Sequence, residues 1–379
     1  MSNNIGVIFP YAESYDSHFG GAIARWVYEV SSRSSKEFEY SIYSASDKND
    51  YGDNVYNSYY GSYCSIVKKL ERTFSKGLLL DKLFFYIKKI TCRDTIWICS
   101  IFRHVKKLDL IIVHNRPKVP ALLRMLGFKG KIFLHMHNSH LYHSTSTTVA
   151  KLNRSADKII YCSNFLKNET VYKYPELASI SEVIYNGVSD KEINYKNAPK
   201  NRSILFAGRI IESKGVIELV KAFNLFRSNN NDYVLNIVGG VSSGSSSQKT
   251  KYLIDLENEI KLSKYKNNIN FLGYLDHKEL LDEMNRSEVL AVPSKWKEPF
   301  GMVALEGFVK GCKVIATEDG GIPEILGGNG FYCKCNPESI SNAISKAISS
   351  DSYVIQNDIG KFTWGSISKK FDMMLRHEH

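Results

Sequence analysis

Short apolar runs alternate with segments of helical periodicity along the first half of the chain. A helix is predicted at 20–30, where Gly20-Gly21 opens the segment. Buried strands are predicted at 5–10, 38–44, 108–114, 131–137, 158–163 and 181–187. Strands that alternate with helices predict a parallel α/β sheet with functional residues at the carboxyl ends of the strands.

The same pattern restarts after a polar stretch at 190–202. The predicted elements are strands at 203–208, 233–239, 269–273, 289–293 and 313–317, and helices at 216–227, 252–264, 277–286 and 301–311. We therefore expect two α/β domains, at 1–190 and 200–361, with a cleft between them. A C-terminal helix at about 362–379 is expected to pack back on the first domain.

The composition is that of a globular protein. The 379 residues are 43% hydrophobic and 23% charged, which excludes wholesale disorder. No apolar run approaches the roughly 18 residues that a membrane-spanning helix needs. Because residues 1–10 lack a basic segment and a long apolar run, we expect no signal peptide and a cytoplasmic protein.

The charge balance points to anionic partners. Lys+Arg 50 and Asp+Glu 39 give a net charge of +11. Nucleotides, phosphorylated glycans, anionic lipids and nucleic acids all fit this charge. The seven cysteines are scattered, and the Cys333-Lys334-Cys335 spacing does not suit a zinc ribbon. We expect reduced thiols and no metal site.

Residues 61–107 form an unusually basic segment. They hold eleven Lys/Arg against three acidic residues, interleaved with apolar runs. This pattern predicts helices that lie on an anionic membrane face. The alternative is an apolar core with a solvated cationic rim. No nucleic-acid reading module is recognisable, so nucleic acid is not an expected partner.

Two carboxylates frame the most specific motif, which runs from Glu298 to Glu306. Glu298 is expected in the loop after a strand and Glu306 one to two turns into the next helix. Paired carboxylates suit sugar hydroxyls, which donate hydrogen bonds to acceptors. The alternative is that Glu298 caps the helix and Glu306 is solvated.

Glycine-rich turns after predicted strands form the other candidate sites. Gly208-Arg209 and Lys214-Gly215 place two cations beside backbone N–H groups. This arrangement suits a phosphate site, and a solvated basic turn is an equal alternative for the motif by itself. Gly20-Gly21 could approach a phosphate or form an ordinary tight turn. The segment 320–324 could hold an anionic or sugar group at its strand end.

Together these ordered motifs resemble glycosyltransferase family 4, the retaining nucleotide-sugar transferases of the GT-B fold, in which two Rossmann-like domains face each other across a cleft. The matching segments are 20–22, 113–115, 135–138, 162–165, 184–188, 207–210, 214–215, 238–239, 271–274, 292–294, 298–306 and 320–324. Residues 135–138 and 298–304 look most like enzymes that add outer-core hexoses to enterobacterial lipopolysaccharide, such as the α-1,2-N-acetylglucosaminyltransferase.

The resemblance implies a role for each matching residue. Arg209 and Lys214 would hold the donor diphosphate, Glu298 the donor sugar and Glu306 the ribose. The other implied donor contacts are made by Gly21, Gly208, Gly273, Tyr274, Met302, Val303 and Ala304. The first domain would bind the acceptor and the second the nucleotide sugar.

Histidines of the first domain complete the implied site. His137 would lie close to the donor sugar and the acceptor. His135 is expected to point to the opposite face of its strand, as a core histidine. Asn115 is expected near the acceptor or supporting the site, and His114 to be structural.

The implied reaction moves a hexose, N-acetylglucosamine or glucose, from a UDP-sugar to a hydroxyl of the lipopolysaccharide core. It would proceed on the front face with retention and without a metal, in keeping with a sequence that has no Asp-x-Asp triplet. Three alternatives stay open: transfer of a heptose or another hexose to a different cell-surface glycan, nucleotide-sugar epimerisation, and a non-catalytic nucleotide-sugar-binding scaffold.

Overall fold

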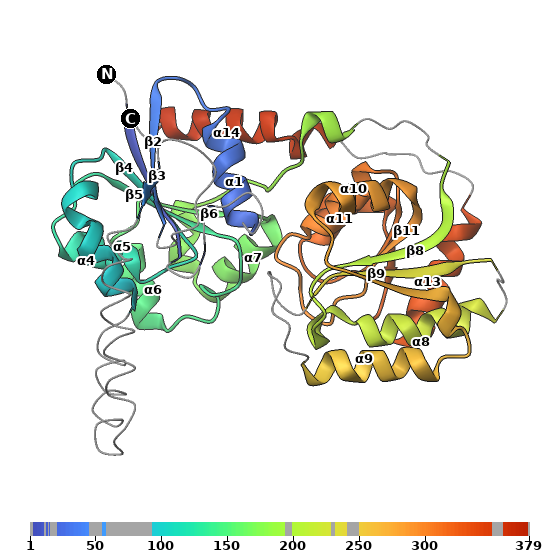
Figure 1. Cartoon of the computed structure of the whole chain (residues 1–379). Coiled ribbons are helices and arrows are strands. Elements are labelled where there is room, and N and C mark those ends of the chain that lie inside the picture. The colour runs from blue at the N-terminus through green and yellow to red at the C-terminus, as the bar shows by residue number, and fades with distance from the viewer. Residues whose placement is uncertain are drawn as a thin grey trace, which may run out of the picture. The chain divides into compact units, whose positions relative to one another are not determined.

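The computed structural model describes two compact units (Figure 1). The described residues are 3–10, 13, 15, 21–44, 55–57, 93–193, 199–228, 232–240, 250–350 and 359–377. Unit 1 comprises Met1–Cys162, Leu166–Ile184 and Ser368–His379, and unit 2 comprises Ser163–Phe165 and Tyr185–Ile367. The chain thus passes from one unit to the other at Ile184, a few residues before the boundary expected from the sequence.

A seven-stranded sheet with all strands parallel forms the centre of unit 1, in the order β3-β2-β1-β4-β5-β6-β7. The strands are β1 (Asn3–Ile8), β2 (Phe38–Ser44), β3 (Val55–Asn57), β4 (Leu110–His114), β5 (Lys131–Met136), β6 (Lys158–Tyr161) and β7 (Ser181–Val183). Every residue of β4 is buried. This agrees with its continuous apolar run, because a central parallel strand is covered on both faces.

The helices that follow these strands are α1 (Ala22–Ser31), α4 (Arg93–Val105), α5 (Val119–Met125), α6 (Ser146–Asn153) and α7 (Asn164–Lys173), with a 3-10 turn η1 (Pro175–Ile180). α1 buries Ile23, Trp26, Val27 and Val30, which recur at the three- and four-residue spacing of one helix face. The predicted helix therefore exists, and it begins after the two glycines.

Unit 2 contains a six-stranded parallel sheet in the order β10-β9-β8-β11-β12-β13. The strands are β8 (Asn201–Ala207), β9 (Val234–Val238), β10 (Ile269–Gly273), β11 (Ser287–Val292), β12 (Lys313–Thr317) and β13 (Phe331–Cys333). The order along the chain reverses between β8 and β11. In open α/β sheets, ligands bind outside the carboxyl ends of the strands at such a switch point.

The main helices of unit 2 are α8 (Val216–Arg227), α9 (Lys251–Leu262), α10 (His277–Arg286), α11 (Met302–Val309), α12 (Ile322–Leu326) and α13 (Pro337–Ser349). Short 3-10 turns are η2 (Asp190–Ile193), η3 (Glu212–Lys214), η4 (Lys266–Asn268), η5 (Gly327–Asn329) and η6 (Ile359–Phe362). α8 and α13 pack on the sheet around a buried core that includes Phe206, Phe223 and Ile344. α8 and α10 have the bounds that periodicity predicts.

The C-terminal helix α14 (Trp364–His377) contributes its last turns to unit 1. Phe371 packs edge-on against Trp26 of α1, with ring centroids 5.2 Å apart. The carboxylate of Asp372 accepts hydrogen bonds from the Ser34 hydroxyl and, at 2.8 Å, from the Ser35 amide. Residues more than 300 positions apart are thereby joined in one core.

Both sheets share the strand order in which the first strand lies beside the fourth, so the predicted α/β class is confirmed. None of the described helices combines the length and the apolar character needed to cross a membrane. Most of the basic segment, 61–92, lies outside the described residues.

Candidate active site

Lys214 and Glu298 meet at the switch point of the unit 2 sheet. Lys214 closes the turn η3 after β8, and Glu298 lies in the loop between β11 and α11. Nζ of Lys214 lies 2.5 Å from Oε1 of Glu298. The fold thus joins two motifs that the sequence could only suggest separately.

The Glu298 carboxylate is buried and strongly hydrogen-bonded. Its Oε1 also accepts bonds from the Ser294 hydroxyl at 2.7 Å and from the Trp296 indole N–H at 2.9 Å. Only 7% of Glu298 is exposed. A cation and two neutral donors replace the water that burial removes from this carboxylate. Among the described side chains, all three bonds fall on Oε1.

Glycines let two loops approach the backbone of the loop that carries Glu298. Gly215 has φ +69°, and a Cβ there would lie 2.1 Å from the carbonyl oxygen of Pro293. Gly320 has φ +99°, and a Cβ there would lie 2.4 Å from the carbonyl oxygen of Glu298. The Gly321 amide donates to that same oxygen at 2.7 Å. Any larger residue would push the loops apart, so these glycines fix the position of Glu298.

The amino end of α11 presents backbone donors that have no partner within the helix. Gly301, with φ +102°, precedes the helix, and the first bond inside it runs from the Leu305 amide to Gly301 O. The amides of Met302, Val303 and Ala304 therefore have no partner within the helix. They form the positive end of the helix dipole, which is suited to phosphate.

Glu306 lies one turn further along α11 and is not solvated. It is 5% exposed, and its Oε1 lies 3.0 Å from Nε2 of His277 at the start of α10. The alternative, a solvated Glu306, is wrong, because the helix face that carries this residue packs against α10. His277 is 45% exposed on its side chain, so the pair reaches the surface through the imidazole.

Residues without side chains line the neighbouring strand ends. Gly208, Gly239 and Gly273 end or follow β8, β9 and β10, and all have positive φ. A Cβ at Gly239 would lie 1.8 Å from the Gly208 carbonyl oxygen, and the Gly239 amide donates to Gly273 O at 2.7 Å. Tyr274, which follows, is 58% exposed.

Arg209 stands apart from the Lys214–Glu298 pair. Its side chain is exposed, and in the described part of the chain it forms no ion pair. The structure therefore joins Lys214 with Glu298 but leaves Arg209 pointing into solvent.

Glu324, in the segment expected to hold an anionic or sugar group, binds protein groups instead. Its carboxylate accepts from the amides of Asn164 at 2.9 Å and Phe165 at 2.5 Å, and from the Tyr185 hydroxyl at 3.0 Å. Asn164 and Phe165 belong to unit 2, as Glu324 and Tyr185 do. Burial and the neighbouring Glu324 carboxylate raise the pKa of the Tyr185 hydroxyl.

The histidines of unit 1 lie together at the carboxyl ends of β4 and β5. His114 and His135 are register partners on the two strands. The expectation that His135 points away from His137 is wrong, since their ring centroids are 4.0 Å apart. Residues two positions apart on a strand share a face. Burial of His135 is confirmed, because its exposed fraction is 0%.

Asn115 holds the backbone at this strand end. It has φ +54°, a left-handed conformation that asparagine tolerates better than most residues. Its side-chain oxygen accepts from the His137 amide at 2.7 Å, and its own amide donates to His135 O at 2.9 Å. Asn115 thus supports the histidines.

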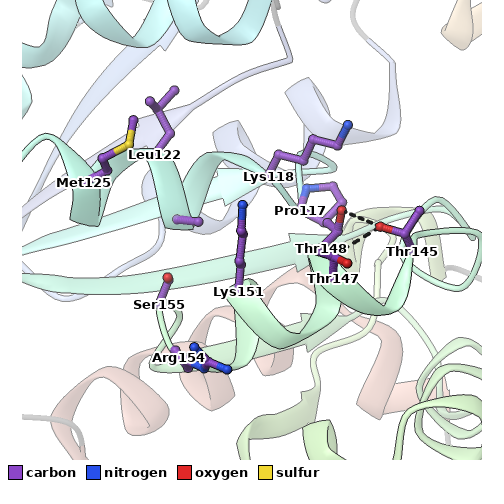
Figure 2. A pocket seen from close by; sticks show the side chains of 11 residues that line it. Pro117, Lys118, Leu122, Met125, Thr145, Thr147, Thr148, Lys151, Arg154 and Ser155 are labelled. Atoms are coloured by element: carbon purple, nitrogen blue, oxygen red, sulfur yellow. Dashed lines mark hydrogen bonds between the residues drawn. The ribbon is translucent and has the colours of Figure 1, made fainter.

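A basic pocket of about 590 Å³ lies between α5 and α6 of unit 1 (Figure 2). Lys118, Lys151 and Arg154 line it together with apolar side chains such as Leu122 and Met125, and none of the described residues that line it is acidic. The Thr145 hydroxyl caps α6 beside it by accepting from the Thr148 amide at 3.3 Å. Sequence reasoning did not single out this pocket.

The first predicted strand-to-helix turn is described only in part. Gly20 lies outside the described residues, and Gly21 precedes α1 with φ −71°. A Cβ at Gly21 would meet no described atom within 4 Å. The backbone therefore does not require glycine there, but the space in front of it is open.

Two residues of the unit 2 site were missed by sequence reasoning. Trp296 lies two positions before Glu298 in the same loop, so its proximity was a usable signal. His277 has no such signal, because α10 and α11 are brought together only by the sheet.

Comparisons with known proteins agree with this architecture. Residues 189–361 match the family model described as Glycosyl transferases group 1. The chain is 25% identical over 389 aligned positions to the lipopolysaccharide 1,2-N-acetylglucosaminetransferase of Salmonella typhimurium, covering 94% of this chain and 93% of that protein. It is 30% identical over 263 positions to an uncharacterized glycosyltransferase of Methanocaldococcus jannaschii, covering 69% of this chain and 66% of the relative.

Among solved structures, Anabaena HepE in complex with UDP and glucose matches with a TM-score of 0.70 and 17% identity, over 98% of this chain and 99% of that one. At this identity the likeness speaks for the fold alone. The GT-B fold class expected from the sequence is confirmed. Residues 189–361 therefore form a domain of the glycosyl transferases group 1 family, within a chain that has the GT-B fold.

Proposed function

We propose that this glycosyltransferase moves a hexose, N-acetylglucosamine or glucose, from a UDP-sugar to a hydroxyl of the lipopolysaccharide core, with retention of configuration. The observation that carries the proposal is the ion pair of Lys214 with the buried Glu298, beside the amides that open α11. The named activity of the Salmonella relative and the UDP named with HepE support the acceptor and the donor.

Lys214, Arg209 and the first amides of α11 are assigned to the diphosphate. Phosphate gains negative charge as the leaving group departs, and fixed donors that meet this charge lower the barrier. The exposed Arg209 side chain is unengaged in the described structure and can turn to a ligand. Gly208 and Gly21 leave room for phosphate beside the backbone.

Glu298 is assigned to the hydroxyls of the donor sugar. Its Oε1 is held by Lys214, Ser294 and Trp296, which fixes the plane of the carboxylate. A sugar hydroxyl can then donate to Oε2. His137 of unit 1 is assigned to the sugar and the acceptor, as the resemblance implies.

Glu306 is assigned to the ribose hydroxyls. His277 holds the carboxylate in place, and Gly273 with Tyr274 offers backbone and an exposed ring for the base. Met302, Val303 and Ala304 contribute amides rather than side chains. Glu306 would therefore bind the nucleotide, whereas Glu298 would contact the donor sugar at the face where transfer occurs.

The transfer is proposed to need no divalent metal. Lys214, Arg209 and the α11 amides supply the positive charge that a cation would otherwise supply at the diphosphate. The acceptor is proposed to bind unit 1, and the three cations of the pocket in Figure 2 suit a phosphorylated glycan. We further propose a cytoplasmic protein that binds the inner face of the inner membrane through residues 61–107.

The direct test is a transfer assay with a panel of UDP-sugars, a truncated lipopolysaccharide acceptor and EDTA. We expect one UDP-sugar to be consumed only with acceptor, and NMR of the product to show an α linkage. Consumption of an ADP- or GDP-sugar instead would reassign the donor. Nucleotide binding without turnover on any acceptor would favour the scaffold.

A further inference from the structure

Three imidazoles converge on one face of the unit 1 sheet, at the ends of β4 and β5. Nδ1 of His114 lies 3.0 Å from Nε2 of His137. Ligand-competent nitrogens of His114, His135 and His137 all lie within 4.8 Å of one another. A His-x-His pair at the end of β5 and a histidine at the end of β4 bring the three rings together.

Two of these imidazoles are buried with nitrogens that nothing in the described structure satisfies. His114 and His135 are both 0% exposed. Nε2 of His114 and both ring nitrogens of His135 lack a hydrogen-bond partner among the described residues. A buried polar group without a partner loses its bonds to water and gains nothing in return, which destabilises the fold. Apolar residues would avoid this cost, so the cluster calls for a ligand that binds nitrogen.

The protonation state of the cluster suits such a ligand. Burial, with the neighbouring His137, lowers the pKa of His114 and of His135 well below the ordinary 6.5. At neutral pH both rings keep a lone pair, which is the form that binds metal ions. Trp26 packs edge-on against His135, with centroids 4.4 Å apart, and holds its ring in place.

The ligand chemistry selects a class of ion. Calcium and magnesium take oxygen ligands, whereas imidazole suits zinc, copper, iron and nickel. Three histidines with an open fourth position are a known ligand set for zinc. Two imidazole nitrogens on one zinc ion stand roughly 3.4 Å apart, so shifts of about 1–2 Å would close the cluster on an ion.

We propose that His114, His135 and His137 form a site for a zinc-class divalent transition-metal ion in unit 1, with water as its fourth ligand. The site does not depend on the proposed transferase activity, because its residues are argued from their own geometry. An ion there would engage the His137 ring that we also assign to the sugar. The test therefore measures metal binding rather than transfer.

The experiment uses the full-length chain, stripped with chelator and without an affinity tag, with zinc alone as the probe. Competition with a chromophoric chelator should show one tight equivalent, and zinc should raise the melting temperature. His135→Gln and His114→Gln should each weaken that equivalent by more than about 100-fold. His143→Gln, which alters an exposed histidine, should leave it unchanged.

A cobalt spectrum of the wild-type protein provides a readout that does not depend on variants that fold. A tetrahedral site gives intense visible absorption that zinc displaces, whereas surface histidines give a weak octahedral spectrum. The proposal is overturned if the wild-type spectrum is octahedral, or if folded His135→Gln and His114→Gln variants bind zinc as tightly as the wild type.

Discussion

In unit 2, the loops that follow β8 and β11 hold an ion pair. In unit 1, the carboxyl ends of β4 and β5 hold three imidazoles instead. Both sheets have the same order of their first four strands. Glu298 is buried but receives three hydrogen bonds. The His135 ring is also buried, but neither of its nitrogens forms a hydrogen bond within the described residues.

The difference shows that topology sets where a site forms and side chains set what it binds. The unit 2 edge combines a cation, a carboxylate and free amides, which suits a charged, hydroxyl-rich ligand. The unit 1 edge gathers three imidazoles, which pack against the aromatic rings of Phe9 and Trp26. The following predictions test this contrast, from the largest expected effect to the smallest.

Removing the charge of Glu298 should have the largest effect on transfer. Glu298→Gln should lower kcat by roughly 10²–10³-fold, the usual effect of losing a preorganised electrostatic contact. Glu298→Gln should be measured with saturating donor, whereas Lys214→Ala, which also removes a proposed phosphate contact, should lower kcat/KM by a similar factor. Glu288→Gln is the control, because Glu288 pairs with Lys313 at 3.2 Å in the same unit. Wild-type turnover in Glu298→Gln would remove that residue from the site.

Gly215→Ala should destabilise unit 2 more than Gly311→Ala. Both glycines are left-handed, at φ +69° and +75°, so each alanine costs about 1–2 kcal/mol. Only at Gly215 does the new Cβ also clash, 2.1 Å from Pro293 O, whereas at Gly311 the nearest atom is 3.7 Å away. Urea unfolding should resolve the difference. Equal losses would mean that the loop beside Lys214 relaxes freely.

Acid should weaken the unit 1 edge in chelated, metal-free protein. The pKa values of His114 and His135 are lowered in the folded state, so the unfolded chain binds more protons below about pH 6.5. Their stabilising contribution is complete above that pH and is lost as the pH falls toward the folded-state pKa. Between these two pKa values, the free energy of unfolding should fall by about 1.4 kcal/mol for each pH unit and each histidine.

Denaturant unfolding measured from pH 7.5 to pH 5, in steps of about half a pH unit, would give this slope. The His114→Gln/His135→Gln double variant is the matched comparison and should have a flatter profile. Identical slopes in the two proteins would show that these rings are not held neutral.

Glu306→Ala should have the smallest effect. Loss of the proposed ribose bonds should weaken UDP binding by about tenfold, corresponding to one or two hydrogen bonds. The value of kcat should change little, because the ribose is bound alike before and during transfer. Equilibrium titration with UDP measures the effect, and an unchanged affinity would contradict the ribose assignment.

Much of the fold could be predicted because periodicity and turn residues agree along the chain. The helices at 216–227 and 277–286 were placed residue for residue. The strand 181–187 was predicted too long, since β7 ends at Val183. Apolar residues after β7 are buried by other elements, and sequence alone cannot separate such burial from pairing in a sheet.

The candidate site was predictable in its parts but not in its contacts. Lys214 and Glu298 were identified from local motifs, yet only the adjacency of β8 and β11 joins them. The supporting His277 has no local signal. The histidine cluster was not predicted because His135 was assigned to the wrong face of its strand. The two-residue spacing from His137 would have placed both rings on the same face.

The most direct test of the central claim is calorimetric titration of UDP, in EDTA, into the wild type, Lys214→Ala and Lys221→Ala. Lys221 is an exposed lysine on α8 that pairs with Glu259 at 3.7 Å, which makes it the matched control. We predict saturable binding to the wild type and to Lys221→Ala, and loss of binding in a folded Lys214→Ala protein. Undiminished binding to Lys214→Ala, or none to the wild type, would contradict a nucleotide-sugar site at the switch point of unit 2.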